Sequence, residues 1–329
     1  LCTLTACNDS KNEDSIDPDP LPPSITYHVE GYAELGAFDH NSTLTVFPLD
    51  KSLAHIEEQA YGGKVETDYG LFSASGNMKF QESLYFEVQV TGNFFNGTKG
   101  RRSEHKTTLR AINHVINHAD EERSINRYIK LPATNVNIFT QLTAARICTL
   151  LKKAAGYNEM SHTITDIYRN ASEQALKEVL TAFSISDIYV SMLSIDPTRA
   201  SFSQYNAPAS MMAAVSNILL TSVDEELLDT FFTEWDKDFA PDGRIDNEDI
   251  KESIRDGQQS LKYTNVYKQL DSFYKAYDFK SDFPEFWKFV DRNGDGILDK
   301  QDKPDDFEIT EEELTPSQQQ CIQLLEQVN

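Results

Sequence analysis

Tyr85-Phe86-Glu87-Val88-Gln89-Val90 alternates apolar and polar side chains, which is the period of a β-strand. The same alternation occurs in 27–32 and 44–47, and turn-forming stretches rich in Gly, Asn and Asp separate these runs. Short strands at regular spacing with such turns are typical of an antiparallel β-sandwich. We therefore predict a β-sandwich domain over residues 25–135.

Beyond Asn135 the apolar residues recur every three or four positions, as they do in helices that bury one face. The pattern predicts helices over about 136–151, 172–183 and 209–220. A fourth helix is expected to start at Ser222, which forms a capping box with Glu225, and to continue to Trp235. Residues 136–221 are accordingly predicted to form a helical domain.

The charge of the chain excludes some classes of partner. The 329 residues include 30 Lys+Arg and 53 Asp+Glu, which gives a formal net charge of −23. Because nucleic-acid phosphates are bound by clustered Lys and Arg, we expect no nucleic-acid binding. The same excess disfavours electrostatic adhesion to anionic lipid, whereas it suits divalent cations.

The first residues of the chain contain a possible processing site. Leu4-Thr5-Ala6-Cys7 resembles the lipobox of bacterial lipoproteins, in which the cysteine thiol becomes the lipid attachment point and the mature N-terminus. The resemblance implies that residues 1–6 are the remnant of a signal peptide and that Cys7 is lipidated. The alternative is an ordinary buried cysteine near a frayed terminus.

The acidic, Pro-rich stretch after Cys7 predicts a disordered tether over 7–24. It resembles the surface-export signals of Bacteroidetes lipoproteins, and Asn8 resembles the residue found there in outer-membrane sorting. The resemblance implies a protein anchored by lipid to the outer membrane and facing outward.

The order of strands over 25–135 resembles the peptidase-regulatory or transthyretin-like β-domains of bacterial surface lipoproteins. The resemblance is based on Val46-Phe47-Pro48-Leu49-Asp50, Gly70-Leu71-Phe72-Ser73 and Tyr85-Phe86-Glu87-Val88. It implies a stalk or adaptor rather than a catalyst, although a fold alone does not fix a function.

Residues 291–302 read Asp-Arg-Asn-Gly-Asp-Gly-Ile-Leu-Asp-Lys-Gln-Asp and fit a twelve-residue calcium loop position by position. Closure by Asp rather than Glu resembles dockerin-type loops, and 283–290 predicts an amphipathic entering helix. The alternative is a solvated acidic turn. The expected ligands are Asp291, Asn293, Asp295, the Ile297 carbonyl, Asp299 and Asp302.

Residues 236–249 fit the same pattern if two residues are inserted before Asp242, a departure that predicts weaker binding. Together the two loops resemble an EF-hand-like or dockerin-like calcium-binding module over 222–304, followed by an acidic tail or short helix over 305–329. The expected cofactor is Ca²⁺, with one ion in the first loop and a second possible here. The ligands in this second loop would be Asp236, Asp238, Asp242, the Arg244 carbonyl, Asp246 and Asp249.

The remaining cysteines carry no recognisable metal or redox motif, because no CxxC spacing occurs. Cys148 lies in an apolar run and is predicted to be a core residue. The sequence leaves open whether Cys148 and Cys321 form a disulfide bridge.

Motifs of common enzymes are missing from the sequence: there is no HExxH, GxSxG, GxGxxG or Walker loop. His114 and His118 lie four apart near Asp120 and could face one metal, but the surrounding Val and Ile favour a strand with an exposed polar face. Carboxylate pairs of glycoside hydrolases cannot be recognised by spacing. We predict that the chain is not an enzyme.

The sequence thus predicts an α+β multidomain chain, an N-terminal antiparallel β-sandwich followed by a mostly helical domain with EF-hand-like calcium loops. The favoured function is a lipid-anchored surface protein that binds a glycan, a protein or an envelope partner. The alternatives are an assembly subunit that docks a partner through its calcium module, and a hydrolase with an unrecognised carboxylate site.

Overall fold

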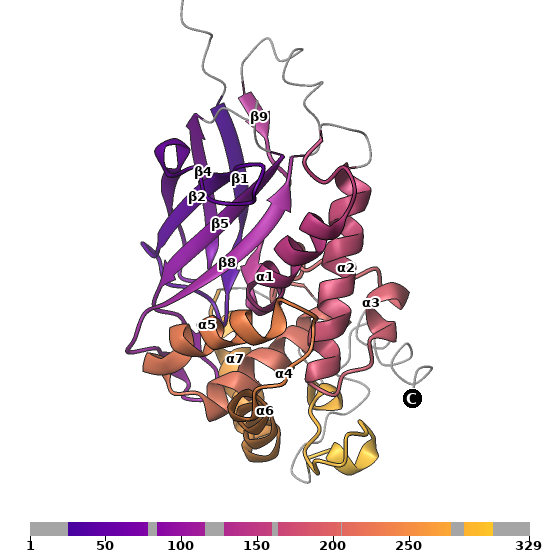
Figure 1. The fold of residues 1–329 in the computed structure, drawn as a ribbon. Coiled ribbons are helices and arrows are strands. Elements are labelled where there is room, and N and C mark those ends of the chain that lie inside the picture. The colour runs from indigo at the N-terminus through magenta and orange to yellow at the C-terminus, as the bar shows by residue number, and fades with distance from the viewer. Residues whose placement is uncertain are drawn as a thin grey trace, which may run out of the picture.

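The computed structural model describes residues 26–77, 84–115, 128–159, 164–204, 206–277 and 286–304. Within these ranges a mixed sheet, curled as a half-barrel, is followed by a helical region, so the predicted α+β class is confirmed (Figure 1). Cys7, the predicted tether and the predicted C-terminal tail lie outside the described residues.

Eight strands form one sheet in the order β10-β1-β4-β3-β2-β5-β8, with β9 paired to β1. Neighbouring strands are antiparallel except β9 and β10, which run parallel to β1. Two shorter strands, β6 (Phe95–Asn96) and β7 (Arg101–Arg102), pair separately. The strands of the main sheet are β1 (Thr26–Glu34), β2 (Thr43–Leu49), β3 (Tyr61–Val65), β4 (Leu71–Asn77), β5 (Tyr85–Gly92), β8 (Thr107–His114), β9 (Tyr128–Lys130) and β10 (Val136–Asn137).

The prediction of a two-sheet sandwich over 25–135 is wrong. Helix α1 (Ile138–Lys153) packs on β8, where a second sheet was expected (Figure 1). A period of two shows that a strand has a buried face, but the same pattern arises whether a sheet or a helix covers that face.

Seven helices occur in the described residues, and the predicted segments over 136–151, 172–183 and 209–220 match helices, except that 136–137 belong to strand β10 and residue 183 lies just beyond the end of its helix. Helix α4 (Ala207–Ser222) is buried along almost its whole length and packs against α6 (Glu248–Ser260) and the 3₁₀-helix η4 (Phe286–Phe289). The helices after α1 are α2 (Ile164–Ala182), α3 (Ile188–Met192), α4 (Ala207–Ser222), α5 (Leu228–Phe239), α6 (Glu248–Ser260) and α7 (Tyr263–Lys275).

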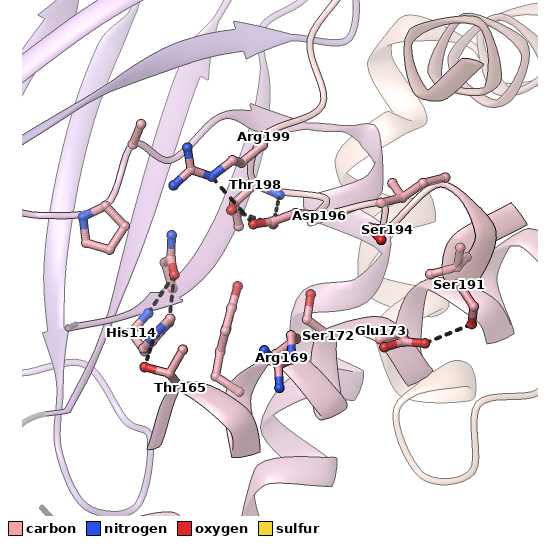
Figure 2. Close-up of a pocket in the computed structure, with 16 residues that line it drawn as sticks. His114, Thr165, Arg169, Ser172, Glu173, Ser191, Ser194, Asp196, Thr198 and Arg199 are labelled. Carbon is pink, nitrogen blue, oxygen red and sulfur yellow. Dashed lines mark hydrogen bonds and ion pairs between the residues drawn. The ribbon is translucent and has the colours of Figure 1, made fainter. Parts of the chain in front are cut away.

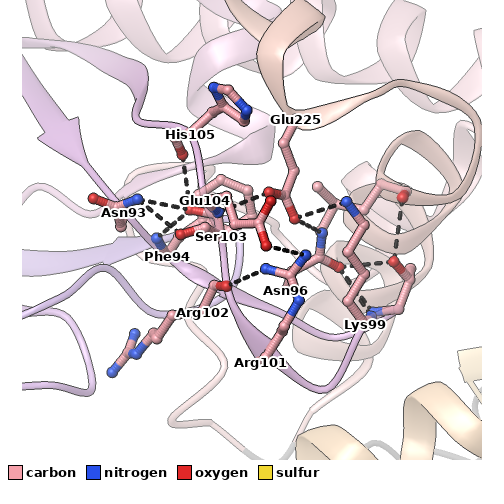
Figure 3. Close-up of polar contacts among 12 residues, drawn as sticks. Asn93, Phe94, Asn96, Lys99, Arg101, Arg102, Ser103, Glu104, His105 and Glu225 are labelled. Carbon is pink, nitrogen blue, oxygen red and sulfur yellow. Dashed lines mark hydrogen bonds and ion pairs between the residues drawn. The ribbon is translucent and has the colours of Figure 1, made fainter.

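The capping box predicted at Ser222 and Glu225 does not form, because Ser222 is the last residue of α4. Glu225 begins the 3₁₀-helix η3 (Glu225–Leu227) and is buried. Its carboxylate accepts hydrogen bonds from Asn96 Nδ2 and the Glu104 backbone N–H, each at 2.8 Å, and pairs with Lys99 Nζ at 3.1 Å (Figure 3). Burial alone would raise the pKa of Glu225, but these donors outweigh it and lower that pKa. Glu225 therefore fastens the β6–β7 hairpin to the helical region.

Two clusters of buried apolar side chains join the sheet to the helices. The larger one contains Phe86 of β5, Phe139 of α1 and Trp235 of α5, all fully buried. The indole Nε1 of Trp235 donates to the Leu142 carbonyl at 2.9 Å, which ties α5 to α1. None of the described helices is both long enough and apolar enough to cross a membrane.

Candidate functional site

The 291–302 loop is closed around the carboxylate of Asp291, which is 3 % exposed. Asp291 Oδ1 accepts the Gly294 N–H at 2.8 Å, and Oδ2 accepts the Gly296 N–H at 2.9 Å. Gly296 has a φ of +79°, a left-handed conformation that favours glycine. The glycine assigned to the sharp turn of the calcium pattern thus has the backbone that such a turn requires.

The other end of the loop is held by Asp302, which is fully buried. Its Oδ1 accepts the Arg292 N–H at 2.8 Å, and its Oδ2 accepts the Asp299 N–H at 3.0 Å. The first and last carboxylates of the pattern therefore fix the loop by bonding to its own backbone.

The ligands predicted between these ends also lie in local turns. Asn293 Oδ1 accepts the Asp295 N–H, Asp295 Oδ1 accepts the Ile297 N–H at 2.8 Å, and Asp299 Oδ1 accepts the Gln301 N–H. No described Lys or Arg forms an ion pair with the four carboxylates of this loop. Ionised carboxylates have about four lone-pair sites each. The loop therefore offers only oxygen ligands, the type that Ca²⁺ prefers, and keeps lone pairs for a cation.

Two features of the calcium-module prediction are missing from the described structure. The expected entering helix over 283–290 is the short 3₁₀-helix η4, with 278–285 outside the described residues, and the residues after the loop form only the 3₁₀-helix η5 (Lys300–Asp302). Within the described ranges, no three acidic, His or Cys side chains converge on one point as a preformed metal cluster would. An EF-hand helix–loop–helix is therefore not shown.

The second predicted loop begins inside a helix, because α5 continues to Phe239. Successive helical residues turn by about 100°, so Asp236 and Asp238, two positions apart, point to different sides. Asp236 Oδ2 pairs with Arg110 at 2.5 Å, while Asp238 Oδ2 accepts the Asp246 N–H at 2.8 Å. Burial raises the pKa of Asp236 to about 6, although Arg110 opposes this.

The rest of the second loop is short, with Asp242, Arg244 and Asp246 exposed and Gly243 buried. Asp242 Oδ1 accepts the Arg244 N–H at 3.0 Å, and Asp249 already lies in the first turn of α6. The structure therefore does not bring Asp236 together with Asp242 and Asp249. Arg146 of α1 attaches the loop to this helix, because its guanidinium donates to the Pro241 carbonyl at 2.9 Å.

A groove of about 540 Å³ is lined by residues of both loops. Arg244 and Ile245 come from the second loop, and Asp291 and Asp295 come from the first. Lys251 and Arg255 of α6 also line it, so cationic and anionic side chains face the same space.

A second cavity, of about 610 Å³, lies between the end of β8, helix α2 and residues 190–199 (Figure 2). We name it the β8–α2 recess. It is lined by Asn113, His114, Pro132, Ala133, Thr165, Tyr168, Arg169, Ser172, Glu173, Val190, Ser191, Ser194, Ile195, Asp196, Thr198 and Arg199.

His114 lies in the wall of the recess, so the prediction of an exposed polar face is wrong for this residue. It is 7 % exposed, stacks on Tyr168, and has Nε2 3.1 Å from Thr165 Oγ1. Burial lowers the pKa of His114 to about 4, so the imidazole is neutral at neutral pH. His118 and Asp120 lie outside the described residues.

The sequence carries no signal for the recess. Its residues come from segments up to 86 positions apart, from Asn113 to Arg199, and no spacing among them matches a chemical motif. Their grouping follows from the packing of α2 against β8, which a pattern in one segment does not reveal.

Comparison of this chain with protein-family models, with curated proteins and with solved structures gave no match.

Proposed function

We propose that this chain is a lipid-anchored cell-surface binding protein whose 291–302 loop holds one calcium ion that stabilises the helical region. The observation that carries the calcium proposal is the pair of buried carboxylates, Asp291 and Asp302, in a loop without a described cationic partner. Burial of an ionised carboxylate is costly unless a counter-charge is present. A divalent cation between them would supply that charge.

The residues that would hold the ion are Asp291, Asn293, Asp295, the Ile297 carbonyl, Asp299 and Asp302. Their backbone bonds orient the side chains before any cation arrives, which lowers the entropy that binding costs. Calcium accepts six to eight oxygen ligands in flexible geometry, so small shifts of Asn293 and Asp295 suffice to complete the shell.

The proposed ion would act on stability because the loop follows η4, which is part of the core. Phe286 and Phe289 are fully buried, and Leu298 packs against the same core from inside the loop. An ion that binds only the native state adds RT ln(1 + [L]/Kd), about 2.7 kcal/mol at a hundredfold excess over Kd. Calcium would therefore hold η4 and the loop against α4.

The test is calorimetric titration of calcium together with thermal melts with and without chelator. Asp295→Ala should remove most of the calcium heat, because a carboxylate ligand is lost at an exposed position. Asp50→Ala is the matched control, since Asp50 Oδ1 accepts the N–H two residues on, as Asp295 does, but lies far from the loop in sequence. If wild-type melts overlay with and without chelator and no calcium heat is seen, the loop is an acidic turn and the proposal fails.

The anchor is tested separately, because Cys7 lies outside the described residues. Cys7→Ser should abolish labelling by a fatty-acid analogue and release the chain from the membrane fraction. Equal labelling of wild type and variant would overturn the lipid anchor and, with it, the proposed outer-membrane location.

A further inference from the structure

We propose that the β8–α2 recess binds a small neutral saccharide. This inference rests on the proposed function as a surface binding protein and adds a site and a ligand class to it, but it uses neither the calcium loop nor the anchor. The volume of about 610 Å³ lies within the range of small-molecule sites, about 300–1,000 Å³.

The walls of the recess are fixed to one another by hydrogen bonds. Tyr168 of α2 donates its hydroxyl to the Ile112 carbonyl of β8 at 2.6 Å. Ser191 of α3 donates to Glu173 of α2 at 2.9 Å (Figure 2). The site is therefore largely formed before a ligand enters, as small-molecule sites usually are.

Six of the twelve polar side chains that line the recess carry a hydroxyl group. One of them, Ser172 Oγ, belongs to a residue that is 4 % exposed; it lies beside the Tyr168 hydroxyl but makes no hydrogen bond of full geometry to the described residues. A buried hydroxyl without such a bond costs about 1–3 kcal/mol, so a ligand hydroxyl that bonds to it would recover that free energy. The hydroxyl side chains that line the recess are Thr165, Tyr168, Ser172, Ser191, Ser194 and Thr198.

The charges of the recess balance. The lining has two cations, Arg169 and Arg199, and two anions, Glu173 and Asp196. Each has an ion-pair partner: Arg199 lies 3.7 Å from Asp196, Arg169 pairs with Asp166 and Glu173 pairs with Lys177. His114 adds no charge at neutral pH. An anionic ligand would therefore gain little, and a wholly apolar ligand would desolvate the charged groups without bonding to them.

A neutral saccharide suits both the polar and the apolar side chains of this lining. Its hydroxyls donate to carboxylates and accept from guanidinium groups, while its C–H faces can contact Pro132, Val190 and Ile195. We therefore expect Arg199 to donate to a sugar oxygen and Ser172 to bond at the base of the site.

The experiment applies the purified full-length chain, in calcium, to an array of neutral, uronate-bearing and sulfated oligosaccharides, and measures affinities for the saccharides retained. We expect retention of neutral saccharides, at least tenfold weaker in Arg199→Ala and in Ser172→Ala. Arg101→Ala is the first control, because Arg101 forms the same kind of pair three positions along, with Glu104 at 3.1 Å. Ser216→Ala is the second, because Ser216 is also a buried serine without a hydrogen bond of full geometry to the described residues.

Retention of acidic saccharides only, no retention at all, or wild-type affinity in both recess variants would each overturn the inference. Melting temperatures of all four variants, measured first, show that they fold. Calcium heat measured on the same samples separates the two proposals: normal calcium heat without saccharide binding rejects the recess alone, and the reverse result rejects the calcium loop alone.

Discussion

The loops 291–302 and 236–249 are both rich in Asp with a Gly at the turn, yet their carboxylates have different partners. In 291–302 the buried Asp291 and Asp302 accept hydrogen bonds from the backbone of their own loop. In 236–249 the first carboxylate, Asp236, is drawn to Arg110 of β8, and the exposed Asp242 caps only a local turn. The spacing of acidic residues thus does not decide by itself whether a loop can gather them.

The difference has a structural cause. Helix α5 extends through Asp236 and Asp238, so these residues cannot curl around a common centre. The 291–302 loop starts after the short helix η4 ends, so no helix holds its first carboxylates on different sides. We therefore expect calcium dependence to belong to the first loop and not to the second.

The strongest test of this contrast is Asp291→Ala. Two backbone N–H groups would lose a charged acceptor, and with hydrogen bonds to charged groups worth about 1.5–3 kcal/mol each, we expect the free energy of unfolding to fall by about 3 kcal/mol without calcium. The proposed calcium stabilisation should vanish as well. Urea denaturation with and without chelator measures both changes, and a variant that still gains stability from calcium would place the ion elsewhere.

How much of this loop the sequence could predict depends on the range of its contacts. Asp291 bonds to Gly294 and Gly296, only three and five positions away, so the pattern of residues contains the geometry. The burial of Glu87 in β5 could not be predicted in this way. Its partners, His55 at 3.1 Å and Arg110 at 3.7 Å, come from other strands and loops.

The same distinction applies to the fold. The alternation in Tyr85–Val90 predicted strand β5, and the helical period predicted α2 and α4. What covers the sheet was not predictable, because α1 and a second sheet would impose the same alternation. Glu225 shows the limit for local motifs: its buried bonds to Asn96 and Glu104, over 120 positions away, replaced the predicted cap.

The second prediction concerns the pH dependence of stability, which we expect to be independent of calcium. Glu34 is fully buried, accepts from Ser201 Oγ and the Phe202 N–H at 3.1 Å each, and burial raises its pKa to about 8. Since an unfolded Glu has a pKa near 4.5, the native state binds the extra proton between these values, and the stability it contributes is full below about pH 4.5 and lost as the pH rises toward 8.

Glu34→Gln should therefore flatten the fall in unfolding free energy between pH 4.5 and 8, and it should leave the calcium effect in place. Urea denaturation at a series of pH values, with and without chelator, measures both. An unchanged pH slope would show that Glu34 is ionised in the native state at neutral pH.

The third prediction concerns Arg110 of β8, the side chain that pairs with Asp236 of the second loop. Arg110 lies 2.5 Å from Asp236 and 3.7 Å from Glu87, and its side chain is 26 % exposed. Loss of one partner of a buried pair costs about 3–5 kcal/mol, and with partial exposure we expect about 2 kcal/mol for Arg110→Met. The loss should be equal with and without calcium in thermal melts. A loss confined to calcium-free protein would mean that Asp236, once released, becomes a calcium ligand.

The smallest expected effect, and the sharpest comparison, comes from Asp242→Ala. Asp242 Oδ1 accepts the Arg244 N–H at 3.0 Å, and Asp295 Oδ1 accepts the Ile297 N–H at 2.8 Å, so both carboxylates cap a turn two residues long. Both are exposed, and surface substitutions of this kind change stability by about 0.5 kcal/mol or less. Chelated samples of Asp242→Ala and Asp295→Ala should therefore melt within a few degrees of wild type.

With calcium, only Asp295→Ala should lose binding heat, because only its carboxylate faces a loop closed by two buried carboxylates. Equal loss of calcium heat in the two variants would mean that both loops bind the ion. The proposal that calcium binds 291–302 and not 236–249 would then be wrong.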